Sequence, residues 1–107
     1  MSFKIIPTPN FQKEFKKLSK KYPSIISDIK ELSNSLSENP TQGSEIFKNC
    51  YKVRIAIKSK GKGKSGGGRL ITYVKIVDKN IYLLTIYDKS DKETVSDTDL
   101  KQLLKDI

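Results

Sequence analysis

Residues 50–58 read CYKVRIAIK, and this stretch decides the fold. Its three β-branched residues alternate with cationic or small ones, which is the period of a strand with one buried and one wet face. Residues 69–77 (RLITYVKIV) and residues 81–87 (IYLLTIY) are also rich in β-branched and aromatic residues and are predicted to be strands. Because short connections join the three stretches, we predict that they pair antiparallel.

Helical patterns flank these strands. Before and after them, apolar residues recur every three or four positions, as on one face of an amphipathic helix. Thr8 before Pro9, and Ser96 three residues before Asp99, are typical of helix N-termini. The predicted elements are a strand over residues 3–6, a helix from Thr8 to Tyr22, a helix from Ser24 to Asn39 and a helix that begins at Ser96.

The order of the elements predicts one α+β domain over residues 1–107. An N-terminal strand and a helical hairpin would pack on an antiparallel sheet of about four strands, with a C-terminal helix. No apolar run is long enough for a membrane span, and no secretory signal is visible. A single cysteine, Cys50, cannot form an internal disulfide. We therefore expect a cytoplasmic protein.

Charge points to a polyanionic ligand. Lys and Arg number 21 against 12 Asp and Glu, a formal charge of +9, and there is no histidine. A small, strongly basic domain is typical of nucleic-acid binding, although lysines can also simply solvate a surface. The missing histidine removes the usual base near neutral pH and the commonest zinc ligand. We expect no metal site and no cofactor.

Strand alternation sorts side chains between the two sheet faces. If the apolar residues of 53–57 face the helices, the opposite face collects cations and aromatic rings. Its members would be Lys52, Arg54, Lys58, Arg69, Tyr73, Tyr87 and Lys89. The buried face would take Leu70, Thr72, Val74 and Ile76, and then Tyr82, Leu84 and Ile86. Cations bind phosphates and rings stack on unpaired bases, so the first set suits RNA. The alternative is an ordinary solvated sheet face.

The loop between the first two strands is rich in lysine and glycine. Residues 60–68 hold five of the six glycines. We predict a mobile hairpin tip, whose glycines allow close approach of an RNA backbone. Its candidate phosphate-binding residues are Lys58, Lys60, Lys62 and Lys64. The alternative is a solvated loop without a ligand.

The stretch from Cys50 to Lys89 resembles the RelE/ParE superfamily of toxins from type II toxin–antitoxin systems. CYKVR (residues 50–54) is similar to the family's cationic strand, and RLITY (69–73) to the next one, which begins with a functional arginine. KGKGKSGGGR (60–69) together with IYLLTIYDK (81–89) is similar to the HigB-like branch. The resemblance extends over nearly the whole chain and implies a RelE-like fold.

The resemblance also implies a function. Such toxins are ribosome-dependent mRNA endonucleases (mRNA interferases) that enter the ribosomal A site of the 30S subunit and inhibit translation. Cleavage is metal-independent, because the 2′-OH attacks the adjacent phosphate. Arg54, Arg69 and Lys89 match the family's phosphate-holding and charge-stabilising positions, and Lys52 with the loop lysines would position RNA. The implied partner is a cognate antitoxin, often of the helix-turn-helix type.

One departure concerns the general base. Many RelE-like toxins carry a tyrosine soon after the last strand, whereas residues 92–96 here read KETVS. Tyr87 and Tyr73 are the replacement candidates, with Tyr87 favoured because it lies nearest to Lys89. A lysine with a depressed pKa is the other option.

Three other functions compete with the nuclease. A ParE-like DNA gyrase inhibitor would share the fold and the antitoxin. A non-enzymatic RNA-binding module would bind RNA without cutting it. A toxin decayed to inactivity would keep only the fold. The dense cationic face argues against the gyrase inhibitor.

Overall fold

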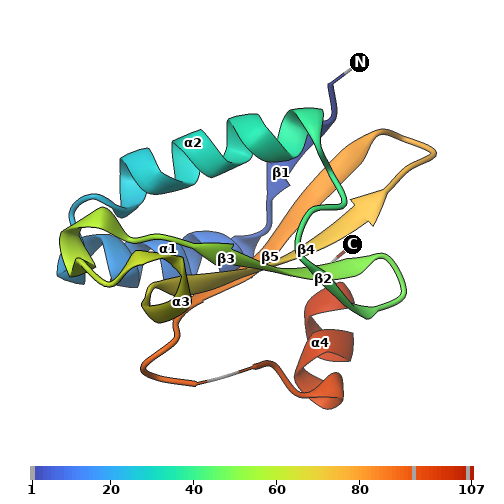
Figure 1. Ribbon diagram of the computed structural model, residues 1–107. Coiled ribbons are helices and arrows are strands. Elements are labelled where there is room, and N and C mark those ends of the chain that lie inside the picture. Colours follow the sequence, from blue (N-terminus) through green and yellow to red (C-terminus); the bar gives the residue numbers. More distant parts are fainter. Residues whose placement is uncertain (1, 93, 106) are drawn as a thin grey trace.

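A computed structural model describes residues 2–92, 94–105 and 107, except for the side chain of Lys64. The strands form one sheet, and helices lie on both of its faces (Figure 1). The elements are β1 (Lys4–Pro7), α1 (Pro9–Lys21), α2 (Ile25–Glu38), β2 (Ser44–Phe47), β3 (Cys50–Ile55), the 3₁₀ turn η1 (Lys58–Lys60), α3 (Gly63–Gly66), β4 (Gly68–Lys75), β5 (Asn80–Asp88) and α4 (Asp97–Leu104). The α+β class and the predicted RelE-like layout are confirmed.

The sheet has five strands in the order β1-β5-β4-β3-β2. The predicted antiparallel pairing of β3, β4 and β5 is confirmed, and β2 pairs antiparallel with β3. The two edge strands differ from the prediction: β2 was not predicted, and β1 runs parallel to β5. The sheet is therefore mixed. The helices α1 and α2 carry the chain from β1 to β2, which forms the opposite edge of the sheet.

Local helix signals acted as predicted at two of three N-termini. The Thr8 hydroxyl accepts a hydrogen bond from the Phe11 N–H at 3.3 Å, and the Ser96 hydroxyl accepts one from the Asp99 N–H at 3.1 Å. Ser24 stands at the N-cap of α2 but does not cap it with its side chain. Its hydroxyl instead donates to the Asp28 carboxylate at 2.7 Å.

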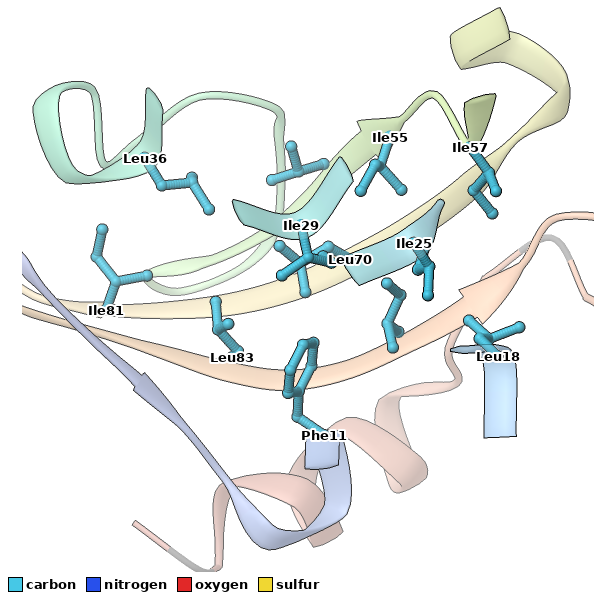
Figure 2. Close-up of a cluster of buried hydrophobic side chains, with 12 residues drawn as sticks. Phe11, Leu18, Ile25, Ile29, Leu36, Ile55, Ile57, Leu70, Ile81 and Leu83 are labelled. Carbon is cyan, nitrogen blue, oxygen red and sulfur yellow. The ribbon is translucent and has the colours of Figure 1, made fainter. Parts of the chain in front are cut away.

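The main core lies between the sheet and the helical hairpin of α1 and α2. Figure 2 shows side chains of both helices meeting sheet residues in this layer. The cluster contains Phe11, Leu18, Ile25, Ile29, Leu36, Val53, Ile55, Ile57, Leu70, Ile81, Leu83 and Ile86. The predicted inward orientation of the residues in 53–57 is therefore confirmed.

A second apolar cluster covers part of the opposite face. It comprises Cys50, Ile71, Leu84, Tyr87, Val95 and Leu100, with Tyr73 and Tyr82 packed against it. In Figure 1, α4 lies on the other side of the sheet from α2. The part of the predicted RNA face that holds Tyr73 and Tyr87 is thus covered by this cluster.

A bulge in β5 explains the error in predicted orientation. Ile71 pairs with Thr85, whereas the next residue, Thr72, pairs with Leu83. Leu84 is therefore the extra residue on β5, and side chains before it change face. Tyr82 and Leu84, predicted to face the main core, lie in the second cluster. Ile76, also predicted inward, lies beyond the end of β4 and is 61% exposed.

Candidate functional site

Four cationic side chains converge on one cleft of about 570 Å³, the cationic cleft. Its walls are formed by Gln42, Gly43, Ser44, Ile46, Lys52, Val53, Arg54, Arg69 and Lys89. The cations come from β3, from β4 and from the residue that follows β5. None of these lining residues is acidic. Fixed cations in a concave surface attract and bind an anion, so the cleft suits a phosphate group.

Arg69 is the innermost of the four. Its side chain is buried, with only 5% of the residue exposed. The guanidinium donates to the Gly68 carbonyl oxygen at 2.9 Å and to the Ser65 carbonyl oxygen at 3.2 Å. These bonds fix the planar fork against the glycine-rich segment before β4. An anion in the cleft would therefore meet a charge that is already oriented.

Arg54 sits directly opposite Arg69 in the β3–β4 ladder. Like charges at opposed positions repel, and such a pair destabilises a sheet. The two arginines of the chain are thus placed where they oppose folding and where both line the cationic cleft. A bound phosphate would offset the repulsion, since each guanidinium can donate two parallel hydrogen bonds to phosphate oxygens.

Glycines set the walls of the cleft. Gly43 has a φ of +97°, and a Cβ there would lie 2.5 Å from the Lys52 carbonyl oxygen. A Cβ at Gly67 would lie 2.3 Å from the Ile55 carbonyl oxygen, and the Gly67 carbonyl accepts the Lys89 N–H at 3.1 Å. Only glycine permits these approaches. The glycine-rich segment therefore packs against β3 and holds Lys89 in place.

A buried carboxylate lies directly before Lys89. Asp88 is fully buried and accepts hydrogen bonds from the Lys60 ammonium at 2.5 Å and from the Tyr22 hydroxyl at 2.6 Å. The Ser90 N–H adds a third at 2.9 Å. Burial by itself raises the pKa of Asp88, but these donors outweigh it and hold the pKa well below its usual range. The network joins α1, η1 and the end of β5.

The same network raises the pKa of Tyr22. The hydrogen bond to Asp88 is the largest cause, and burial adds to it. Ionising this phenol would place two negative charges against each other. Tyr22 is thus a hydrogen-bond donor to the carboxylate.

Tyr73 and Tyr87 do not line the cationic cleft. Tyr87 is opposite Arg69 in the β4–β5 ladder but is only 5% exposed, and the Lys92 ammonium lies 5.0 Å from the centre of its ring. The Tyr73 ring packs near that of Tyr82, with 6.1 Å between ring centres. Both tyrosines belong to the second apolar cluster. Their proposed role as a base stays a prediction.

The predicted RNA-binding lysines are divided among several places. Lys52 lines the cationic cleft. Lys58 forms an ion pair with Glu31 of α2 at 3.1 Å, on the other side of β3. Lys60 faces Asp88 and is not part of the cleft. Lys62 is exposed in the turn before α3, and the side chain of Lys64 lies outside the described residues.

The loop that was predicted as a mobile hairpin tip contains two short helical turns, η1 and α3. Sequence reasoning also missed the wall of the cleft that Gln42, Ser44 and Ile46 supply, because β2 was not predicted. It missed Asp88 as well, since a single acidic residue between Tyr87 and Lys89 carries no spacing signal.

Cys50 does not line the cationic cleft. Burial raises the pKa of the Cys50 thiol to about 11, so this group stays protonated near neutral pH. Within the part of the chain that the structure describes, no three Cys, Asp or Glu side chains gather as metal ligands would. Nor does any described helix have the length and apolarity to cross a membrane.

Comparisons with known proteins bear on the family and the fold. The family described as "RelE toxin of RelE / RelB toxin-antitoxin system" matches residues 3–106. An arginine double mutant of the E. coli toxin RelE in the free state shares 15% identity, with a TM-score of 0.65 over 100% of this chain and 99% of that one. The RelBE2 toxin–antitoxin complex from Mycobacterium tuberculosis gives 15% identity and a TM-score of 0.62 over 82% of this chain and 99% of the other. The intact E. coli RelBE toxin–antitoxin complex gives 16% identity and a TM-score of 0.61, over 81% of this chain and 96% of the other.

Proposed function

This chain belongs to the RelE family of toxins from toxin–antitoxin systems, and on that premise we propose that it is a ribosome-dependent mRNA endonuclease. The single observation that carries the proposal is the convergence of Lys52, Arg54, Arg69 and Lys89 on one concave surface whose described lining includes no acidic residue. A site for RNA cleavage needs fixed positive charge where the reacting phosphate gains negative charge.

In the proposed reaction the nucleophile is the 2′-OH of the message itself. The 2′ oxygen forms a bond to the adjacent phosphorus, and the bond from phosphorus to the 5′ oxygen of the next nucleotide breaks. The products are a 2′,3′-cyclic phosphate and a 5′-hydroxyl. Arg54 and Arg69 hold the non-bridging oxygens, whose charge rises in the pentacovalent transition state.

Two protons must move. The 2′-OH loses one, and the leaving 5′ oxygen gains one. Lys52 and Lys89 are the amines that line the cationic cleft. In the proposed reaction one of them accepts the first proton and the other donates the second. Tyr87, which lies next to this site in the ladder, is the alternative acceptor.

Partners follow from the family and from the charge. We propose that the toxin acts in the cytoplasm at the A site of the 30S subunit, where Lys52 and Lys62 contact messenger or ribosomal RNA. The printed descriptions of two similar structures name complexes with an antitoxin. We propose a cognate antitoxin here too, of the helix-turn-helix type if the chain belongs to the HigB-like branch.

The proposal is tested by inducing the protein in cells and mapping message ends by primer extension, with and without active ribosomes. We expect ribosome-dependent cuts inside codons. Intact messages in growth-arrested cells would instead favour a gyrase inhibitor. Intact messages without growth arrest would favour an RNA-binding module or an inactive toxin.

A further inference from the structure

We propose that a second cleft, between α2 and the outer edge of β3, is a nucleobase subsite in which Asp28 accepts a hydrogen bond from an exocyclic amino group. This inference rests on the proposed function, because it assigns a specificity element to the same RNA site. The cleft has a volume of about 230 Å³. Small-molecule pockets usually measure about 300–1,000 Å³. The second cleft lies below this range, so it could hold one flat ring but not a whole nucleotide.

The second cleft adjoins the cationic cleft. Gln42 and Arg54 line both of them. Pairing between β2 and β3 ends where Ser44 meets Lys52, so the following residues of β3 form an edge. A phosphate held by Arg54 and Arg69 on one side of this edge would leave the attached base within reach of the other side.

Asp28 supplies the polar contact. The residue is 4% exposed and lines the second cleft. Its Oδ2 accepts from the Ser24 hydroxyl at 2.7 Å and from the Lys58 N–H at 3.1 Å. Its Oδ1 is buried and has no hydrogen-bond partner among the described residues. A buried carboxylate oxygen without a donor is costly, so a small side-chain adjustment that admits a donor from the second cleft would be favoured.

The remaining lining residues suit a planar base. Leu32, Ile55 and Ala56 give an apolar surface, and the Arg54 guanidinium can stack on a ring as well as bind phosphate. Lys58 and Glu31 neutralise each other at the rim. Adenine, cytosine and guanine each carry an amino group, whereas uracil lacks one. A carboxylate oxygen accepts from an amino group and repels a carbonyl oxygen, so the subsite selects against uracil.

A basic protein segment could also donate to Asp28, but the observations favour RNA. Such a segment would have to approach past Lys52, Arg54, Arg69 and Lys89, whose charges repel it. An RNA strand is attracted by the same four charges.

The test titrates the ¹⁵N-labelled protein with 2′-O-methyl trinucleotides at low salt and follows the Lys58 amide by NMR. Paired ligands differ by one amino group: guanosine against inosine, adenosine against purine riboside, and cytidine against its analogue without the amino group. We expect about tenfold weaker binding for the amino-less member at one position. Asp28→Asn should remove the difference, and Glu38→Gln, an exposed residue at the end of the same helix and outside the cleft, should keep it.

Equal affinities for every pair, or no binding, would overturn the subsite. The same holds if Asp28→Asn, folded by its NMR spectrum, keeps the wild-type preference. An Asp28→Asn variant with unchanged trinucleotide affinities but weaker antitoxin binding would assign the cleft to a protein.

Because the 2′-O-methyl ligands cannot be cut, the outcome is separate from nuclease activity. A wild type that binds with amino preference but cuts no message would keep the subsite and refute the proposed function. If the folded Asp28→Asn variant cannot be obtained, the paired ligands still decide on the wild type alone.

Discussion

Arg54 and Arg69 are direct partners across the β3–β4 ladder, and both line the cationic cleft. Two guanidinium groups at opposed positions repel each other in the free protein. The arrangement is consistent with a site that was shaped for an anion at the expense of some stability.

Arg54→Ala should separate binding of the phosphate from stability of the fold. The side chain is exposed and its partner in the ladder carries the same charge. We expect cleavage to fall by about 100-fold, the usual loss for one charge-stabilising donor. The free energy of unfolding should stay the same or rise slightly, because the repulsion is removed. Cleavage assays and urea titrations measure the two effects, with Lys75→Ala, whose ion pair with Asp78 lies at the far end of β4, as the control. Wild-type cleavage in Arg54→Ala would contradict the role of the cleft.

Lys89→Ala and Tyr87→Phe distinguish the two candidate proton acceptors. Lys89 lines the cleft, whereas Tyr87 is 5% exposed and packs in the second apolar cluster. We expect Lys89→Ala to lose about 100-fold in cleavage rate and Tyr87→Phe to remain within a few-fold of the wild type. A pre-steady-state cleavage assay on programmed ribosomes measures both. A comparable loss in Tyr87→Phe would return the acceptor role to tyrosine.

Lys60→Met should unfold more easily although it leaves the cleft intact. Removing this ammonium leaves the fully buried Asp88 carboxylate without its nearest cation, and only the exposed Lys21 ammonium remains, at 4.0 Å. Breaking a buried pair in this way costs about 3–5 kcal/mol, and we expect about 3 kcal/mol because Tyr22 and the Ser90 N–H still donate. Chemical denaturation measures the loss. The exposed Lys62→Met should change stability by about 0.5 kcal/mol or less. Equal stability of the two variants would show that the ion pair does not stabilise the fold.

Acid should weaken the protein through Asp88. Its pKa is lower in the folded than in the unfolded state, so the folded state binds fewer protons. The carboxylate therefore contributes stability above its unfolded pKa of about 3.9, and this contribution is lost as the pH falls from there toward the folded value. We expect the free energy of unfolding of the wild type to drop more steeply below about pH 4 than that of Asp88→Asn. Parallel curves for the two proteins, measured by urea titration across this range, would contradict the assignment.

The sequence predicted those parts of the fold that depend on local patterns. Alternation identified β3, β4 and β5, and hydroxyl caps identified the starts of α1 and α4. β2 was missed because SEIF carries no clear alternation and its pairing with β3 depends on the tight turn at residues 48–49 between the two strands. The parallel pairing of β1 with β5 joins residues about 75 positions apart, a relationship that no local pattern encodes.

Local strand patterns also located part of the candidate site, and tertiary packing decided the rest. Strand alternation correctly placed Lys52, Arg54 and Arg69 on one face, and Lys89 joins them. It could not show that the α4 segment covers Tyr87 and Tyr73, since tertiary packing decides which part of a sheet face stays open. Nor could it pair Lys60 with Asp88, because a flexible lysine can turn to either side of its loop.

The most direct test of the central claim uses purified toxin and ribosomes programmed with a defined codon in the A site. The message carries either ribose throughout or a single 2′-deoxy nucleotide on the 5′ side of the cut, and no metal is added beyond what the ribosome requires. We predict cleavage of the ribose message to a 2′,3′-cyclic phosphate, with no cleavage of the deoxy message and about a 100-fold or greater loss in Arg69→Lys, which keeps the charge but not the fork. Cleavage of both messages, or of neither by the wild type, would contradict the account.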